Sequence, residues 1–115
     1  MDYNDNYGAY AFETDEIIFL WDDAPDDDYM ETVEIISKSY SENIKHIAEC
    51  IFDEIGDVLE AESPEEILDG LGRPQIYPEA CQVTYCEHNF DDSHIICFEY
   101  FDESFEEIEN ITIDG

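Results

Sequence analysis

Cysteine and histidine side chains gather in the second half of the chain, where their types would suit a zinc ion. Cys86 and His88 are two residues apart, Cys81 precedes them, and His94 and Cys97 follow. Zinc sites usually combine a C-x2-C pair with a second pair at a fixed distance. Cys81 and Cys86 are five apart, a spacing that places them on opposite faces of a strand. We therefore expect strand residues here and no cofactor, while a metal assay tests the zinc alternative.

A second candidate for metal chemistry is the acidic stretch 22–28, which reads DDAPDDD. It lacks the central glycine and the glutamate at the twelfth position that define an EF-hand calcium loop. Carboxylates are favourable at a helix N-terminus, so the same residues fit a loop that leads into a helix. We interpret the stretch as an anionic helix-entry loop with incidental cation binding at most.

Patterns typical of catalysis are missing from the sequence. It contains no G-x-S-x-G, no glycine-rich phosphate loop and no H-E-x-x-H. Carboxylate pairs are so frequent that none of them singles out an acid–base site, and few basic residues are present to hold an anionic substrate. We predict that the protein is not an enzyme.

The charge of the chain is its most unusual property. Its 115 residues include 33 Asp and Glu against 3 Lys and Arg, for a formal net charge of −30. Hydrophobic residues make up 43% and aromatic residues 14%, whereas disordered acidic tails are poor in such residues. The length suits one folded domain over residues 1–115. A net charge of roughly 2–8 is enough to keep a small domain soluble, so solubility alone does not explain this composition.

Three origins of the charge can be compared. A halophilic environment produces acidic surfaces. A metal-storing or mineral-binding protein usually shows long acidic runs, whereas the pure acidic runs here are short, as at Asp26–Asp28. A surface that binds a cationic site on another protein explains the composition best. Direct binding of nucleic acid is disfavoured, because such binders neutralise phosphates with Lys and Arg.

The N-terminal sequence and the hydropathy bear on location. The first twelve residues lack the basic and apolar regions of a signal peptide. No apolar stretch approaches the ~18–20 residues of a membrane span. We expect a cytoplasmic protein with reduced thiols and no membrane contact, in the host cytosol if it is phage-encoded. Cys50 and Cys97 lie beside aliphatic residues and are interpreted as small core residues.

The strongest periodic signal is an apolar stripe with intervals of three and four residues, which predicts one long or kinked helix. Its members are Tyr29, Val33, Ile36, Tyr40, Ile44, Ile47, Ile51, Ile55 and Val58. Ser37, Ser39 and Ser41 form a patch of weak helix formers, so a split into two helices, the second capped by Ser41, is the alternative.

Shorter elements surround this helix. Runs 9–12 and 17–21 predict an N-terminal hairpin. Ser63, Pro64 and Glu66 fit the N-cap, N1 and N3 positions of a short helix that Gly70 closes. Residues 71–78 are expected to form a connector. Three further strands are expected at 81–88, 94–101 and 105–113, with turns at 89–93 and 102–104. The predicted fold is therefore α+β in the order ββααβββ, with an antiparallel sheet (the hairpin plus a three-strand meander) packed against the long helix.

The acidic residues occupy positions that the apolar stripe leaves free. Glu42, Glu49, Asp53 and Glu60 are spaced 7, 4 and 7 residues apart, which forms a ridge with carboxylates about 6 and 11 Å apart on a helix. DNA phosphates recur on a comparable length scale. A merely solvated helix usually carries Lys at i+4 from its acids, and no member of the ridge has one. The predicted partner-binding residues are Asp22, Asp23, Asp26, Asp27, Asp28, Glu31, Glu34, Glu42, Glu49, Asp53, Asp57 and Glu60.

In size, charge and helix-plus-sheet build, the chain resembles the acidic inhibitors of phages and mobile elements that imitate DNA, namely anti-restriction proteins, anti-CRISPR proteins and uracil-glycosylase inhibitors. It is also similar to acidic immunity proteins. The resemblance implies a stoichiometric inhibitor, monomeric or dimeric, that blocks target DNA binding by a basic nucleic-acid-binding protein or nuclease complex. The alternatives are an immunity protein that neutralises a basic nuclease toxin and a halophilic-type structural or interaction domain. Tyr3, Tyr7 and Tyr10 are candidate apolar anchors.

Overall fold

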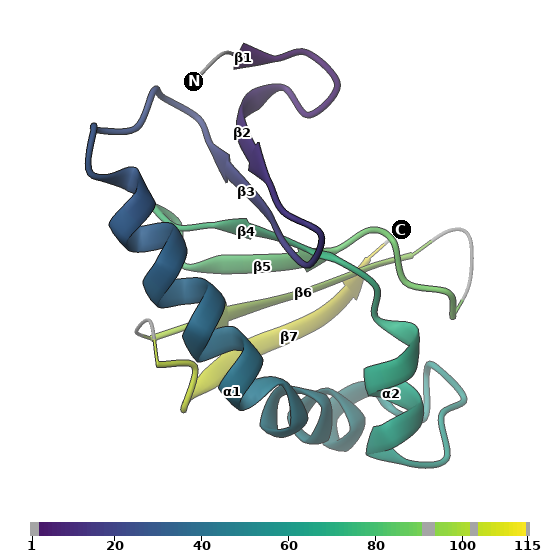
Figure 1. The fold of residues 1–115 in the computed structure, drawn as a ribbon. Coiled ribbons are helices and arrows are strands. Elements are labelled where there is room, and N and C mark those ends of the chain that lie inside the picture. The colour runs from purple at the N-terminus through teal and green to yellow at the C-terminus, as the bar shows by residue number, and fades with distance from the viewer. Residues whose placement is uncertain (1–2, 91–93, 102–103, 115) are drawn as a thin grey trace.

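The computed structural model describes residues 3–90, 94–101 and 104–114, and its elements are labelled in Figure 1. In chain order they are β1 (Tyr3–Asn4), β2 (Ala9–Glu13), β3 (Ile18–Trp21), α1 (Tyr29–Ile55), α2 (Pro64–Gly70), β4 (Pro74–Tyr77), β5 (Gln82–Tyr85), β6 (Ile95–Tyr100) and β7 (Ile108–Asp114). The turns expected at 91–93 and 102–103 lie outside the described residues.

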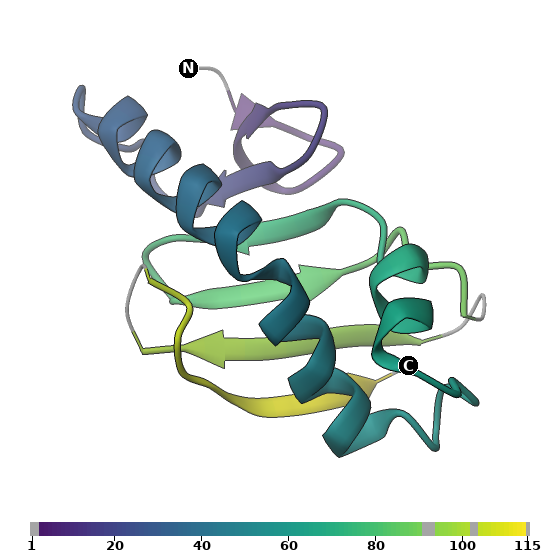
Figure 2. The same cartoon turned by 60° about the horizontal axis from the view of Figure 1, so that its bottom comes forward.

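The seven strands form one sheet in the order β1 to β7, so every strand lies beside its neighbours in sequence. All pairs are antiparallel except β3 and β4, which are parallel. A parallel pair needs a crossover connection, and α1 with α2 supplies it. Figure 2 shows both helices on the same face of the sheet. The fold is thus α+β with a mostly antiparallel sheet, as the sequence predicts in outline.

The predicted strand order was wrong in two places, because β1 and β4 were not expected. Gly72, Pro74 and Pro78 made residues 71–78 resemble a connector, yet Pro74 is the first residue of β4, a position where strands accept proline. Ile76 is fully buried and pairs with both Phe19 of β3 and Val83 of β5. Strand β4 therefore lies between the N-terminal hairpin and the C-terminal strands, and the sheet has seven strands in place of the two plus three expected.

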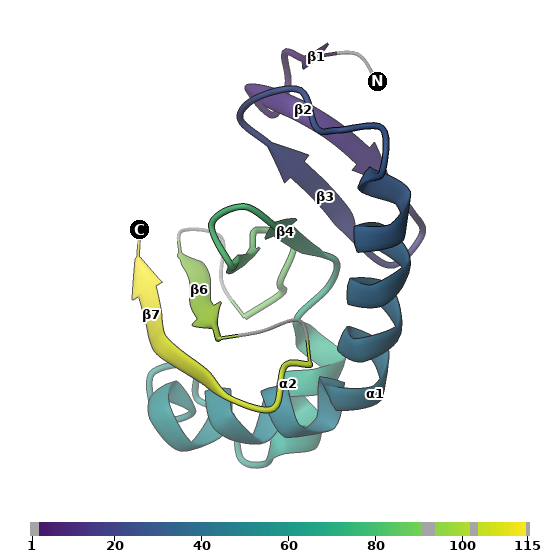
Figure 3. The ribbon, with the colours of Figure 1, turned by 90° about the vertical axis from the view of Figure 1, so that its left-hand side faces the viewer.

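Helix α1 is continuous through Ser37, Ser39 and Ser41, which confirms one long helix over two. Its axis changes direction along its length, as the views in Figures 1 and 3 agree. Asn43 ties the helix to the segment before β7, because its Nδ2 donates both to the Ser39 carbonyl at 2.9 Å and to the Ser104 carbonyl at 2.7 Å.

The predicted apolar stripe faces the sheet and forms most of the helix side of the core. Seven α1 residues are buried, and Tyr29 and Ile44 are partly buried against them. The prediction fails at Val58, which is 61% exposed, while Leu59 is buried. The α-helix ends at Ile55. After Ile55 the helical spacing of 3.6 residues per turn therefore no longer determines which side chains are buried.

Helix α2 begins as predicted. Ser63 is its N-cap, and the Ser63 Oγ accepts a hydrogen bond from the Glu66 N–H at 3.4 Å. The Glu66 carboxylate reaches back to the N–H of Glu62 at 2.7 Å. Gly70 is the last helical residue.

Strand β3 is buried on both faces. Phe19 and Trp21 point into the main core beneath α1. Ile18 and Leu20 form a second cluster with Ala9 on the opposite face. The cysteines expected in the core are only half-buried: Cys97 lies on the outer face beside Thr84, with Oγ1 3.5 Å from Sγ, and Cys50 lies near the α1 surface.

Candidate partner-binding surface

All twelve predicted partner-binding carboxylates are on exposed residues, and they divide into three segments. The β3–α1 loop carries Asp22, Asp23, Asp26, Asp27 and Asp28; α1 carries Glu31, Glu34, Glu42, Glu49 and Asp53; the turn after α1 carries Asp57 and Glu60. The structure therefore presents them all to solvent, but it does not gather them into one ridge.

The ridge on α1 holds for three of its four members. At ~100° per residue, Glu42, Glu49 and Asp53 lie within about 40° of one another, on the side opposite the buried stripe. Glu60 is not on the helix, which is a correction. Its φ is +58°, its N–H donates to the Asp57 carbonyl, and the N–H of Ala61 donates to the Gly56 carbonyl. This pair of bonds is the Schellman arrangement that closes a helix, with Glu60 where glycine is usual.

The outer face of α1 also carries basic residues at spacings other than four residues from the acids, which the sequence prediction did not take into account. Lys38 and Lys45 lie within about 60° of Glu42 around the helix, and both are exposed. Lys45 and Glu49 line the same hollow of about 160 Å³ between α1 and α2. Two of the three basic residues of the chain thus dilute the acidic ridge. The sequence already indicated that these lysines lie beside the ridge, because their positions around the helix follow from ~100° per residue.

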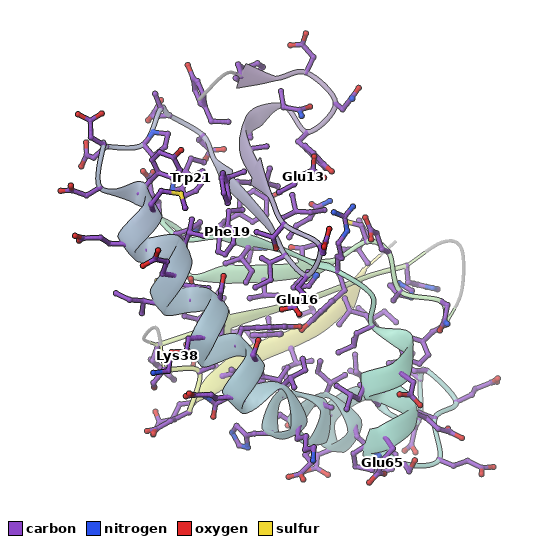
Figure 4. All side chains as sticks on the ribbon, in the orientation of Figure 1. Glu13, Glu16, Phe19, Trp21, Lys38 and Glu65 are labelled. Carbon is purple, nitrogen blue, oxygen red and sulfur yellow. The ribbon has the colours of Figure 1, made fainter. Side chains whose placement is uncertain are left out.

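The β3–α1 loop has no such compensation. No Lys, Arg or His precedes Lys38 in the chain, and Lys38 is nine residues into α1, about 14 Å along its axis from Tyr29. Figure 4 marks Trp21 beside the start of α1 and Lys38 further along the helix. The loop end of the molecule therefore carries five exposed aspartates with no basic residue near them in the chain.

Two adjoining hollows, each of about 240 Å³, lie at this end and share Trp21 and Glu79. The first is also lined by Asp26, Asp28 and Tyr29. The second is also lined by Asp22 and Tyr77. Tyr77 packs on the outer-face cluster and Tyr29 on the main core, so the two hollows lie toward opposite faces of the sheet and meet at its end. We call this pair of hollows the Trp21 groove. Sequence reasoning missed Glu79 and the aromatic walls, since only the pairing of β3 with β4 brings residues 77–80 beside the β3–α1 loop.

The chain topology explains where the groove lies. Strands β3 and β4 run parallel, so Trp21 and Tyr77 end them at the same edge of the sheet. From there β3 leaves toward α1, whereas β4 turns back into β5. The Trp21 groove lies where these two connections diverge.

The aromatic side chains of the groove are held by ring contacts. The Trp21 and Tyr29 rings meet edge to face with centroids 5.8 Å apart, and Tyr29 meets Phe12 at 6.0 Å. Trp21 also stacks on Phe19 at 6.3 Å. Because Trp21 is only 4% exposed, its ring belongs to the core and offers little surface to a ligand, whereas Tyr29 is partly buried.

The ion pairs of the described residues lie away from this surface. Arg73 binds the Glu87 carboxylate with two nitrogens, at 3.1 and 2.9 Å, and reaches Glu13 at 3.4 Å. The Arg73 hydrogen bond lowers the pKa of Glu87. Among the described residues, none of the twelve predicted carboxylates is in an ion pair, and Glu34 forms none with Lys38 four residues later.

Only one of the three predicted tyrosine anchors is mostly free. Tyr3 is 51% exposed. Tyr7 and Tyr10 are partly buried: the Tyr7 hydroxyl donates to Glu13 at 3.0 Å, and the Tyr10 ring contacts Tyr3 edge to face at 5.4 Å.

The cysteine and histidine residues do not assemble a metal site in the part of the chain that the structure describes. Cys81 and Cys86 flank β5 instead of lying within it. The N–H of Phe90 donates to His88 Nδ1 at 3.2 Å, so the other ring nitrogen carries the proton and donates to the His94 carbonyl at 2.6 Å. Both ring nitrogens of His88 are occupied by the backbone.

No protein-family model matches the chain, and no curated protein or solved structure is significantly similar to it. Among the described residues, the helices are too short or too polar to cross a bilayer.

Proposed function

We propose that this protein is a stoichiometric inhibitor that presents a DNA-mimicking acidic surface to a basic nucleic-acid-binding protein or nuclease complex. It blocks target DNA binding in the manner of anti-restriction or anti-CRISPR proteins, acts in the cytoplasm, and performs no catalysis of its own. Neither nucleic acid nor membrane is bound directly. The contact surface centres on the β3–α1 loop and extends along the outer face of α1.

The observation that carries the proposal is the exposed, uncompensated charge of the loop. Its five aspartates are all solvent-exposed, and no described residue forms an ion pair with any of them. Concentrating like charge opposes folding, so a chain gains little from such a loop unless a cation meets it. A groove lined with Lys and Arg for DNA phosphates supplies that complement, and it releases bound counterions when it is neutralised.

The salt dependence of binding tests the electrostatic basis of the proposal. Proteins captured from a host lysate would be tested for displacement by duplex DNA, and the affinity of the captured partner would be measured between about 50 and 500 mM NaCl. Screening shortens the reach of charges, and complementary charges speed association. We expect affinity to fall steeply with salt and DNA to compete. A partner whose affinity is flat with salt, or unaffected by DNA, would contradict the function.

Charge reversal locates the surface. Three triple-lysine variants change the formal charge equally: Asp22, Asp23 and Asp27 in the loop; Glu42, Glu49 and Asp53 on α1; and Glu106, Glu107 and Glu109 as the control near β7. We expect the loop variant to weaken binding most, the α1 variant less, because Lys38 and Lys45 already dilute that face, and the control least. Equal losses in all three would mean that total charge matters and its placement does not.

A further inference from the structure

We draw no further inference here: the strongest candidate, the hollow of about 160 Å³ between α1 and α2 that Ala48, Pro64 and Leu68 line, is an open apolar surface, and nothing in the structure shows what covers it.

Discussion

Two tyrosine hydroxyls meet inside the core between α1 and β5. The oxygens of Tyr40 and Tyr85 are 2.6 Å apart and both residues are buried. Desolvation is the main cause that raises the pKa of each hydroxyl above its ordinary value. The two neutral hydroxyls therefore form a hydrogen bond with each other in a part of the core that water does not reach.

We predict that Y40F destabilises the protein by about 1–3 kcal/mol, because it leaves the Tyr85 hydroxyl buried without its partner. The double variant Y40F/Y85F is expected to be more stable than Y40F alone, since it leaves no orphaned hydroxyl. Urea unfolding at pH 7 measures both. A double variant with the summed cost of the two single variants would show that the hydroxyls act independently.

The same pair predicts a loss of stability at high pH. Above the ordinary tyrosine pKa of about 10, the unfolded chain releases these two protons while the folded chain keeps them. The free energy of unfolding then falls with pH, by about 1.4 kcal/mol per pH unit for each group. Urea unfolding from pH 9 to 11 measures the slope, and Y40F/Y85F should flatten it. An unchanged slope in the double variant would assign the effect to other groups.

Among the elements, β4 depends on a tight approach at Gly72. Gly72 has φ +73°, and a Cβ there would lie 2.7 Å from the Glu87 carbonyl oxygen. A side chain at this position would therefore collide with the segment that follows β5. Because β4 joins the two halves of the sheet and ends at the Trp21 groove, its placement matters beyond local stability.

We predict that G72A destabilises the protein by about 2–3 kcal/mol, the sum of a left-handed conformation without glycine and a backbone clash. G8A is the matched control: Gly8 has φ +67°, but the nearest atom to its Cβ would be 3.9 Å away. The control should cost only about 1 kcal/mol, for the conformation alone. Thermal or urea unfolding measures both, and equal costs would exclude the clash with Glu87.

At the scale of the whole molecule, the net charge of −30 acts against its own compact state. Raising NaCl from about 10 to 150 mM shortens the Debye length from about 30 to 8 Å. We predict that the melting temperature rises by at least about 4 °C, the shift that 1 kcal/mol produces in a domain near this size. Differential scanning calorimetry measures it, and sucrose at equal osmolarity, which does not screen charge, should have a smaller effect.

This measurement also separates the proposed inhibitor from the halophilic alternative. An inhibitor that acts in an ordinary cytoplasm must be folded at 150 mM salt, and most of the gain should come below that concentration, where the Debye length changes most. A chain that remains unfolded until salt reaches molar concentration would favour a halophilic-type domain and count against the proposal.

The sequence by itself determined the elements whose signals are local. The apolar stripe of α1 was correct from Tyr29 to Ile55, because one face of a helix must be buried whatever it packs against. The Ser63 cap of α2 and the β2–β3 hairpin were likewise readable, since their hydrogen bonds join near neighbours. The exposure of the five predicted carboxylates on α1 followed from the same periodicity.

Only the tertiary structure decided what depends on pairing between distant segments. Strand β4 begins with one proline and is followed by another, which hides its two strand-favouring residues, and it forms because β3 and β5 lie on either side of it. The parallel pairing of β3 with β4 is what brings Glu79 and Tyr77 beside Trp21 and Asp26. No local sequence pattern predicts this arrangement, because the stability of a strand depends on the neighbouring strand as much as on its own residues.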